Sequence, residues 1–338
     1  MDKIIQHPAS DLGKDWNDGN FDAAAVQAAR QGVALCDRSH WGRIQVSDQD
    51  RLRFLHNQST NDLQRRAPGE GCDTVMVTST ARTIDLVTAY VMEDAVLLLV
   101  SPNRRQELMD WLDRYIFFAD KVQLTDLTSE TATFSLIGPH TDGLIAQLGA
   151  GAIIGKPYAT HQLVQMGDIE VRVAVGSGLA MSGYTLIVPV VNAATLWSNM
   201  IKSGAVPLGD RVWEQLRIEQ GRPAPDHELT EDYNPLEAGL WHAISFDKGC
   251  YIGQETIARL NTYKGVKQKL WGIRLSAPAE PGSVITVGGE KVGKLTSYTD
   301  TDHGCFGLGY VRTKVGGVGL KVQIGQTEGE IVEVALFQ

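Results

Sequence analysis

The pattern of hydrophobic and polar positions changes at about residue 270 of the chain. Before that point, helical spacing predicts helices over 22–30 and 51–57, whereas β-rich runs predict a strand over 41–46 and a three-strand antiparallel meander over 73–100. Strands are mixed with helices without regular β-α-β alternation. This order favours an α+β fold over a doubly wound parallel sheet.

The same periodicities predict the remaining elements of this first region. Leu108 and Leu112 recur with two aromatic residues at helical spacing after Ser101-Pro102, which predicts a helix whose apolar side belongs to the core. The other predicted elements are strands over 122–127, 132–137 and 183–188, a strand pair around 167–168, a short helix ending at 148, and helices over 193–203 and 211–220.

Beyond residue 270 the helical pattern disappears and Gly and Val dominate. Gly288-Gly289 separates two apolar runs in the manner of a two-residue hairpin turn. A separate small β-barrel or sandwich is therefore expected, with residues 261–265 as the joint. Its further strands are predicted over 305–311, 320–324 and 330–337.

Length and charge limit the possible functions. A chain of 338 residues is expected to form two or three packed units, and its formal net charge of −9 argues against binding of duplex nucleic acid. Apolar runs such as 95–100 have strand length, so no membrane span is expected. Met1–Pro8 lacks the basic start and apolar run of a secretory signal, which predicts a cytoplasmic protein.

The four cysteines, Cys36, Cys72, Cys250 and Cys305, are far apart in the sequence. They form no CxxC pair and have no zinc-type spacing with histidine. Neither a disulfide framework nor a protein metal site is expected.

Cys250 has the most informative surroundings. It follows Lys248-Gly249 and precedes Gly253, after which residues 254–260 have helix-forming composition. A tight loop that leads into a helix N-terminus is predicted, where peptide dipoles and a nearby cation favour thiolate over thiol. The alternative is a small, buried, inert cysteine.

Besides Cys250, the candidates for chemistry are Asp85, Trp241, His242 and Arg217, and each also has a simpler structural interpretation. Asp85 is an acid within an apolar strand, so it is either buried with a partner or a ligand, or exposed on the solvated side of the meander. Trp241 is either a platform for a ring or part of the core. His242 is a possible base near Cys250, or a local hydrogen bonder, and His56 is interpreted as a solvated helix residue.

Arg217 lies among apolar residues of a predicted helix. Its guanidinium can reach a carboxylate in the interior, or it can pair with Glu214 or Glu219 on the outside of the helix.

Five motifs together resemble a known family. Lys248-Gly249-Cys250-Tyr251-Ile252-Gly253-Gln254-Glu255 is similar to the K-G-C-[FY]-x-G-Q-E signature of YgfZ-type proteins, which are relatives of the glycine cleavage T-protein. The other four matching segments are Cys36–Ile44 (D-x-S-x-x-G-x-I), Leu136–Pro139 (L-x-G-P), Leu216–Gly221 (L-R-[LI]-E-x-G) and Asn234–Leu240 (N-P-x-E-A-G-L).

This resemblance implies a three-lobed ring of two interleaved α+β lobes and a C-terminal β-barrel. Residues 1–262 would form the folate-binding region, with the second lobe at about 48–130, and residues 267–338 the barrel. Tetrahydrofolate is the implied cofactor. The implied contacts are Arg217 with its glutamate carboxylate, Trp241 with its pterin or benzoyl ring, and Asp85 and Lys248 elsewhere on the ligand.

The resemblance also implies two different activities. Ala81–Leu86 is similar to the G-G-x-x-D-D stretch of T-proteins, with Asp85 on the first acid, but Gly183-Tyr184-Thr185 continues into Leu186 without the Gly-Glu pair of G-Y-T-G-E-x-G. T-proteins have no cysteine at position 250, whereas the YgfZ type is defined by it. Cys250 and Asp85 are therefore the candidate catalytic residues.

The function expected on this basis is that of a monomeric, tetrahydrofolate-binding, YgfZ-type accessory protein. Its implied clients are iron–sulfur proteins, including enzymes that modify tRNA. The alternatives are an aminomethyltransferase that makes methylene-tetrahydrofolate and a non-catalytic folate-binding scaffold.

Overall fold

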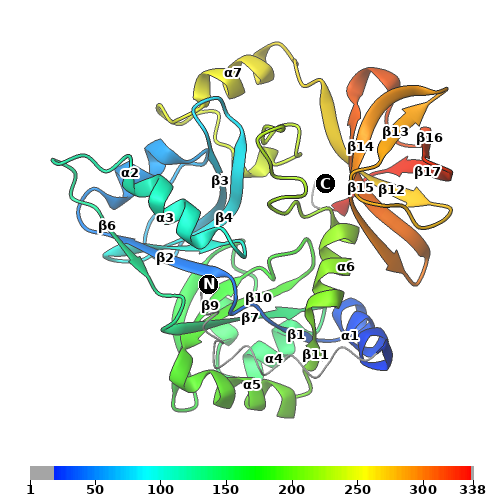
Figure 1. Cartoon of the computed structure of the whole chain (residues 1–338). Coiled ribbons are helices and arrows are strands. Elements are labelled where there is room, and N and C mark those ends of the chain that lie inside the picture. Colours follow the sequence, from blue (N-terminus) through cyan, green and yellow to red (C-terminus); the bar gives the residue numbers. More distant parts are fainter. Residues whose placement is uncertain (1–18, 336–338) are drawn as a thin grey trace, which may run out of the picture. The chain divides into compact units, whose positions relative to one another are not determined.

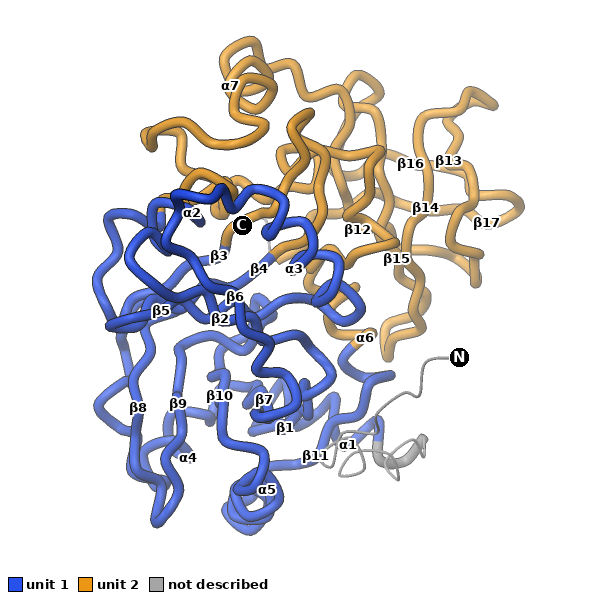
Figure 2. Tube along the Cα trace, turned by 60° about the vertical axis from the view of Figure 1, so that its left-hand side comes forward, with its two compact units in different colours: residues 1–55, 63–73, 87–213 blue, residues 56–62, 74–86, 214–338 orange. Residues whose placement is uncertain are grey.

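The computed structural model describes residues 19–335, which divide into two compact units (Figures 1 and 2). Unit 1 contains residues 19–55, 63–73 and 87–213, and unit 2 contains residues 56–62, 74–86 and 214–335. Met1–Pro8, on which the expectation of a cytoplasmic protein depends, lies outside the described residues. Within residues 19–335, no helix is both long and apolar enough to cross a membrane.

Unit 1 contains a six-stranded sheet in which one edge pair is parallel and the other neighbouring strands are antiparallel. In spatial order the strands are β11 (Val206–Leu208), β1 (Ala34–Asp37), β7 (Thr131–Ile137), β10 (Gly183–Pro189), β9 (Ile169–Val175) and β8 (His161–Met166). The helices of this part are α1 (Gly19–Gln31), α4 (Thr141–Gln147) and α5 (Ala193–Lys202), with 3-10 turns at η2 (Gly151–Ile153) and η3 (Val190–Asn192).

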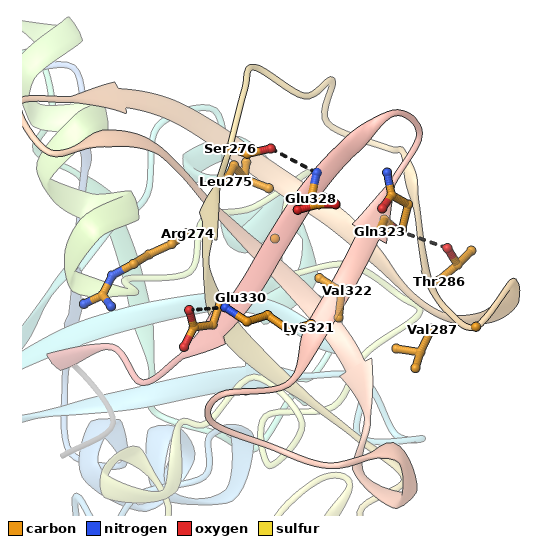
Figure 3. A pocket seen from close by; sticks show the side chains of 12 residues that line it. Arg274, Leu275, Ser276, Thr286, Val287, Lys321, Val322, Gln323, Glu328 and Glu330 are labelled. Atoms are coloured by element: carbon orange, nitrogen blue, oxygen red, sulfur yellow. Dashed lines mark hydrogen bonds and ion pairs between the residues drawn. The ribbon is translucent and has the colours of Figure 1, made fainter.

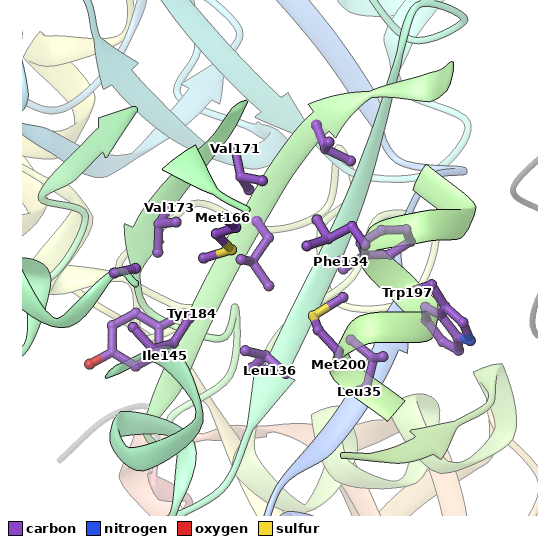
Figure 4. Close-up of a cluster of buried hydrophobic side chains, with 14 of the residues drawn as sticks. Leu35, Phe134, Leu136, Ile145, Met166, Val171, Val173, Tyr184, Trp197 and Met200 are labelled. Carbon is purple, nitrogen blue, oxygen red and sulfur yellow. The ribbon is translucent and has the colours of Figure 1, made fainter. Parts of the chain in front are cut away.

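An apolar core lies between this sheet and its helices (Figure 4). In α5, Ala193, Leu196, Trp197 and Met200 are buried, and their i, i+3, i+4, i+7 spacing defines a single helix face. The indole of Trp197 meets the ring of Phe134 on β7 edge-to-face, with centroids 5.3 Å apart. The periodicity that predicts this helix therefore also identifies its packing face.

The second sheet of unit 1 includes the predicted meander. Its order is β3 (Gly71–Val77), β4 (Thr83–Val91), β5 (Ala95–Val100), β2 (Gly42–Ser47) and β6 (Gln123–Asp126), and its helices are α2 (Arg51–Gln58) and α3 (Arg105–Asp113). Tyr90 and Leu99 of this sheet share a buried cluster with Ala174 and Ile187 of the six-stranded sheet. β3 and β4 continue from unit 1 into unit 2, where their residues 74–77 and 83–86 belong.

Unit 2 contains the predicted C-terminal barrel, which is closed and consists of six strands. In spatial order they are β12 (Gln268–Leu275), β15 (Gly304–Arg312), β14 (Glu290–Thr301), β13 (Val284–Val287), β16 (Lys321–Ile324) and β17 (Thr327–Val332), and η5 (Thr313–Val315) follows β15. Gly288 and Gly289 have φ values of +58° and +83° and form the predicted hairpin turn. The α+β class and the barrel are thus confirmed.

The last strand does not lie where the sequence pattern places it. A strand was expected over 330–337, but β17 begins at Thr327 and ends at Val332. Gly325, with φ +61°, turns the chain so that Thr327 already pairs with Ile324. Residues 336–337 of the expected strand lie outside the described residues.

The rest of unit 2 connects the barrel to the short segments 56–62 and 74–86. It contains the end of α6 (Asp210–Gln220), η4 (Trp241–Ala243) and α7 (Gln254–Thr262). Val75 and Val77 of the second segment share a buried cluster with Leu240 and with Tyr310 of the barrel. Segment 74–86, far upstream in the sequence, therefore contributes to the core of unit 2.

We predict that Gly183→Ala destabilises unit 1. Gly183 has φ +154°, and a Cβ at this position would lie 1.9 Å from the backbone oxygen of Leu136 on the paired strand β7. Because backbone cannot yield as a side chain does, we expect the free energy of unfolding to fall by about 2 kcal/mol or more in chemical denaturation. The control is Gly143→Ala on α4, where no heavy atom lies within 4 Å, and which should be neutral or stabilising. Equal stability of the two variants would contradict this prediction.

Candidate functional site

Cys250 lies in the loop between η4 and α7 of unit 2, and its side chain is exposed. The loop leads into α7 through Gly253, which has φ +78°. A Cβ on Gly253 would also lie 2.9 Å from the carbonyl oxygen of Thr78. A glycine is therefore needed here both for the positive φ and for the close approach of the Thr78 backbone. The expected tight loop before a helix is confirmed, whereas the alternative of a buried cysteine is wrong.

Lys248 fixes this thiol loop, which comprises residues 245–253. Its ammonium is buried and donates hydrogen bonds to the carbonyl oxygens of Ser59 at 2.7 Å, Asn61 at 2.8 Å and His56. The same nitrogen lies 4.7 Å from the ring centroid of Tyr251. An ammonium has three N–H donors, and the three carbonyls accept all of them. The expected contact between Lys248 and a cofactor is therefore replaced by a structural role.

Backbone hydrogen bonds add to the attachment of the thiol loop to segment 56–62. The Ile252 N–H donates to the Asn57 carbonyl at 2.9 Å, and the Ser245 N–H donates to the Thr60 carbonyl at 3.0 Å. The Thr60 hydroxyl in turn donates to the carbonyl of Ala243 at 2.6 Å. The loop is thus held before and after Cys250, while the thiol itself faces solvent.

His56 differs from the expectation of a solvated helix residue, because it is only 6% exposed. Its Nδ1 lies 3.2 Å from Oδ1 of Asp62. Its Nε2 lies 3.6 Å from the position that a Cβ on Gly249 would occupy, next to Cys250. The His56–Asp62 pair was missed from the sequence, although position 56 continues the i, i+3, i+4 pattern of Leu52 and Leu55.

Asp85 is fully buried in β4, in the part of that strand that belongs to unit 2. The alternative of an acid on the solvated side of the meander is therefore wrong. The neighbouring Leu86 is buried as well, because this end of the strand is covered on both faces. Asp85 and Cys250 thus belong to the same unit, on β4 and on the thiol loop.

Arg217 is buried and its donors are used within the protein. The guanidinium pairs with Glu228 at 2.8 Å and, through Nε and Nη2, with both carboxylate oxygens of Glu214. It also donates to the Ser297 hydroxyl at 2.8 Å and the Arg222 carbonyl at 3.5 Å. Burial alone would lower the pKa of Arg217, but the two carboxylates raise it above its usual value.

These contacts account for all five guanidinium N–H donors. The sequence allowed two interpretations of Arg217, an ion pair with an interior carboxylate and an ion pair with Glu214 on the outside of the helix. The structure contains both pairs, the first with Glu228. No donor of the guanidinium remains for a ligand, so Arg217 does not have the expected role as partner of a folate carboxylate.

Trp241 and Phe246 form an exposed aromatic pair upstream of Cys250. Each side chain is 42% exposed, and the ring centroids are 6.0 Å apart with an interplanar angle of 36°. The interpretation of Trp241 as a core residue is wrong, and an accessible ring surface remains. Phe246 was not identified from the sequence, and His242, beside Trp241 in η4, is exposed.

Two cavities of unit 2 lie apart from Cys250, Trp241 and Asp85. One, of about 620 Å³, is formed by barrel strands, and Lys321 and Glu330 form an ion pair at its wall (Figure 3). The other, of about 710 Å³, has five basic side chains and two acids in its lining, which are Arg82, Lys264, Lys267, Arg312, Lys314, Asp232 and Glu237. Within residues 19–335, no group of three or more His, Cys, Asp or Glu side chains is placed to hold a metal ion.

The order of elements and the matched motifs define the class of this protein. The chain belongs to the family described as the GCVT N-terminal domain, whose model matches residues 13–248. The expected relationship to the glycine cleavage T-protein is thereby confirmed.

Individual relatives support the same assignment. A chloroplastic protein of Arabidopsis thaliana, which its name proposes to be a transferase, is 49% identical over 313 residues, covering 92% of this chain and 72% of the relative. The aminomethyltransferase of Symbiobacterium thermophilum is 28% identical over 88% of this chain and 83% of its own length. The crystal structure of the glycine cleavage aminomethyltransferase T of Bartonella henselae has a TM-score of 0.82 at 19% identity, covers 94% of this chain and 89% of that chain, and shows the same fold.

We predict that Lys248→Met loosens the thiol loop. The substitution leaves three carbonyl oxygens without their cationic donor, and hydrogen bonds to charged groups contribute about 1.5–3 kcal/mol each. Hydrogen exchange of the Ile252 amide should become at least about tenfold faster, because its acceptor Asn57 belongs to the same attachment. The matched control is Lys291→Met on the surface of β14, which should leave this amide unchanged. An unaltered Ile252 amide in Lys248→Met would show that Lys248 does not anchor the loop.

Proposed function

We propose that this chain is a tetrahydrofolate-binding, YgfZ-type accessory protein for iron–sulfur proteins, including enzymes that modify tRNA. The observation that supports this function best is the exposed Cys250 thiol in a loop held by Lys248. The aminomethyltransferase fold supports the folate part of the proposal. The thiol adds an exposed nucleophile in a loop that leads to the N-terminus of α7.

The residues of unit 2 fit the aromatic part of a folate better than its acidic part. Trp241 and Phe246 present accessible faces, which suit stacking of the pterin or benzoyl ring. Arg217 and Lys248 donate their hydrogen bonds to oxygen atoms of the protein, so the glutamate carboxylates of the folate require other partners. Bound tetrahydrofolate would supply a one-carbon carrier, and Trp241 would orient it.

The second candidate function is that of an aminomethyltransferase. It is favoured by relatives of that name and by Asp85, which occupies the position of the first acid of the matching motif. The strand β10 argues against it, because Leu186 and Ile187 continue the strand where the T-protein motif has its Gly-Glu pair. Ammonia release from an aminomethyl-lipoyl carrier distinguishes the two functions. Efficient turnover that is lost in Asp85→Asn would establish the transferase instead of the accessory protein.

We predict that tetrahydrofolate binds and that Trp241→Ala weakens this binding about tenfold, since ring contacts contribute about 0.5–1.5 kcal/mol beyond their buried area. Titration calorimetry measures the dissociation constant for the parent protein and the variant. Trp241→Phe retains an aromatic ring and should lose less affinity. The control is Trp271→Ala, which removes a half-buried indole from barrel strand β12 and should not change the affinity for tetrahydrofolate. If the parent protein gives neither heat nor a thermal shift with tetrahydrofolate, the folate assignment is wrong.

We predict that Cys250→Ser leaves folding and tetrahydrofolate binding intact but abolishes support of an iron–sulfur client. Cys250 is exposed, so the substitution changes the nucleophile without opening a cavity. The measurement is the activity of a cluster-dependent tRNA-modifying enzyme in cells whose copy of this gene carries the substitution. Cys305→Ser, at a half-buried thiol of the barrel, is the control and should retain support. Full client activity with Cys250→Ser would favour the non-catalytic folate scaffold.

A further inference from the structure

The cavity of about 710 Å³ in unit 2 is lined by five basic side chains, although the chain as a whole has a net charge of −9. These side chains come from three segments that are far apart in the sequence. The segments are the turn before β4, the connection between α7 and β12, and the end of β15 with η5, and all three belong to unit 2. In chain order the five residues are Arg82, Lys264, Lys267, Arg312 and Lys314.

Backbone pairing holds the barrel side of this basic cavity in place. Gln268 at the start of β12 pairs with Arg312 at the end of β15. Directly beyond this pair, the Thr313 N–H donates to the Lys267 carbonyl oxygen at 2.9 Å. The segments that carry Lys267 and Arg312 are therefore fixed against each other by the strands of the barrel, and the cavity does not need a ligand to bring them together.

Four of the five cations have no side-chain partner in the part of the chain that the structure describes. Arg82 donates through Nη1 to the carbonyl oxygen of Asp232 at 2.9 Å. The side-chain nitrogens of the other four form neither a hydrogen bond nor an ion pair with any of residues 19–335, and all four side chains are exposed. These four are Lys264, Lys267, Arg312 and Lys314. Their donors are therefore available to a ligand.

Two carboxylates also line the cavity, but neither forms an ion pair within residues 19–335. Asp232 is exposed, whereas Glu237 is only 7% exposed and accepts the N–H of Asn234 at 3.1 Å. Burial raises the pKa of Glu237, although its hydrogen bonds and the nearby charges of Arg82 and Lys267 act in the opposite direction. Glu237 thus serves the backbone of unit 2, and the cavity keeps an excess of positive charge.

We propose that this cavity binds a small molecule that carries two adjacent phosphate groups. Like charges around one cavity repel each other, so an anion that enters it removes this repulsion and is attracted by all five cations. Phosphate oxygens accept hydrogen bonds in three directions, whereas a carboxylate accepts them in one plane. Cations that converge from three segments therefore suit phosphates better than carboxylates. The volume is that of an ordinary small-molecule site.

This inference goes beyond the proposed function, because the basic cavity shares no lining residue with Cys250, Trp241 or Asp85. Two adjacent phosphates occur both in free diphosphate and in nucleotides. Inorganic pyrophosphate presents the shared chemistry alone and is the probe for the site. ADP distinguishes the two sources, since tighter binding of ADP than of pyrophosphate assigns a nucleotide, and equal or weaker binding assigns the free diphosphate.

The experiment is titration calorimetry of the full chain with pyrophosphate, at a constant ionic strength low enough that the Debye length exceeds about 10 Å. We expect the parent protein to bind. Lys267→Gln and Arg312→Gln should each weaken binding about tenfold, because each removes one charge-assisted contact. The double variant should bind about 100-fold more weakly if the two contacts act independently. Lys291→Gln, which removes an exposed cation of β14 outside the cavity, is the matched control and should bind like the parent.

Absence of pyrophosphate binding by the parent protein would overturn the inference, and so would an equal loss of affinity in Lys291→Gln. Citrate, which carries carboxylates only, should bind at least about tenfold more weakly than pyrophosphate. Equal affinity for citrate would contradict the assignment of phosphate. Competition of pyrophosphate with tetrahydrofolate would contradict a separate site. Thermal unfolding checks that each variant is folded, and Lys314→Gln replaces Arg312→Gln if the latter is not.

Discussion

The buried ammonium of Lys248 is the constraint on which the candidate site depends. A desolvated cation must find acceptors within the protein, and this one takes three carbonyl oxygens from a segment far upstream, at separations of 192, 189 and 187 residues. Two of these carbonyls follow the C-terminal end of α2, where a positive charge is also favoured by the helix dipole. The position of the thiol loop relative to His56 is therefore fixed by electrostatics, and Cys250 is held in place without being buried.

The second buried cation, Arg217, follows the same principle. It joins α6 to Glu228 and to Ser297 of the barrel strand β14, and Glu228 is itself inaccessible to solvent. Removing one partner of such a pair leaves an uncompensated charge, which costs more than the pair contributes. Lys248 and Arg217 both lie in segments that resemble family motifs, yet both serve to hold unit 2 together. A motif therefore identifies residues that matter, whereas their hydrogen-bond partners decide whether a ligand can use them.

Elements with a strong local pattern could be predicted from the sequence. The face of α5 and the Gly288-Gly289 hairpin depend on helix periodicity and turn chemistry within one short stretch. The short strands β1 and β11 could not be predicted, because three residues of Val206–Leu208 become a strand only by pairing with a segment far upstream. The same holds for the candidate site. The loop around Cys250 has a local signature, but the burial of His56 and Asp85 depends on segments 56–62 and 74–86 packing within unit 2.

The positions of the two candidate groups indicate different kinds of chemistry. Asp85 is enclosed, so anything that meets its carboxylate must be small or must enter the protein. Cys250 is exposed at the middle of a loop that is held on both sides, so its sulfur can reach a group carried by another macromolecule. Transfer to or from a partner requires this combination of access and fixed position, since an inaccessible nucleophile cannot meet the partner and an unanchored one loses orientation. The thiol loop therefore presents an accessible sulfur in a fixed position, on a fold that this chain shares with aminomethyltransferases.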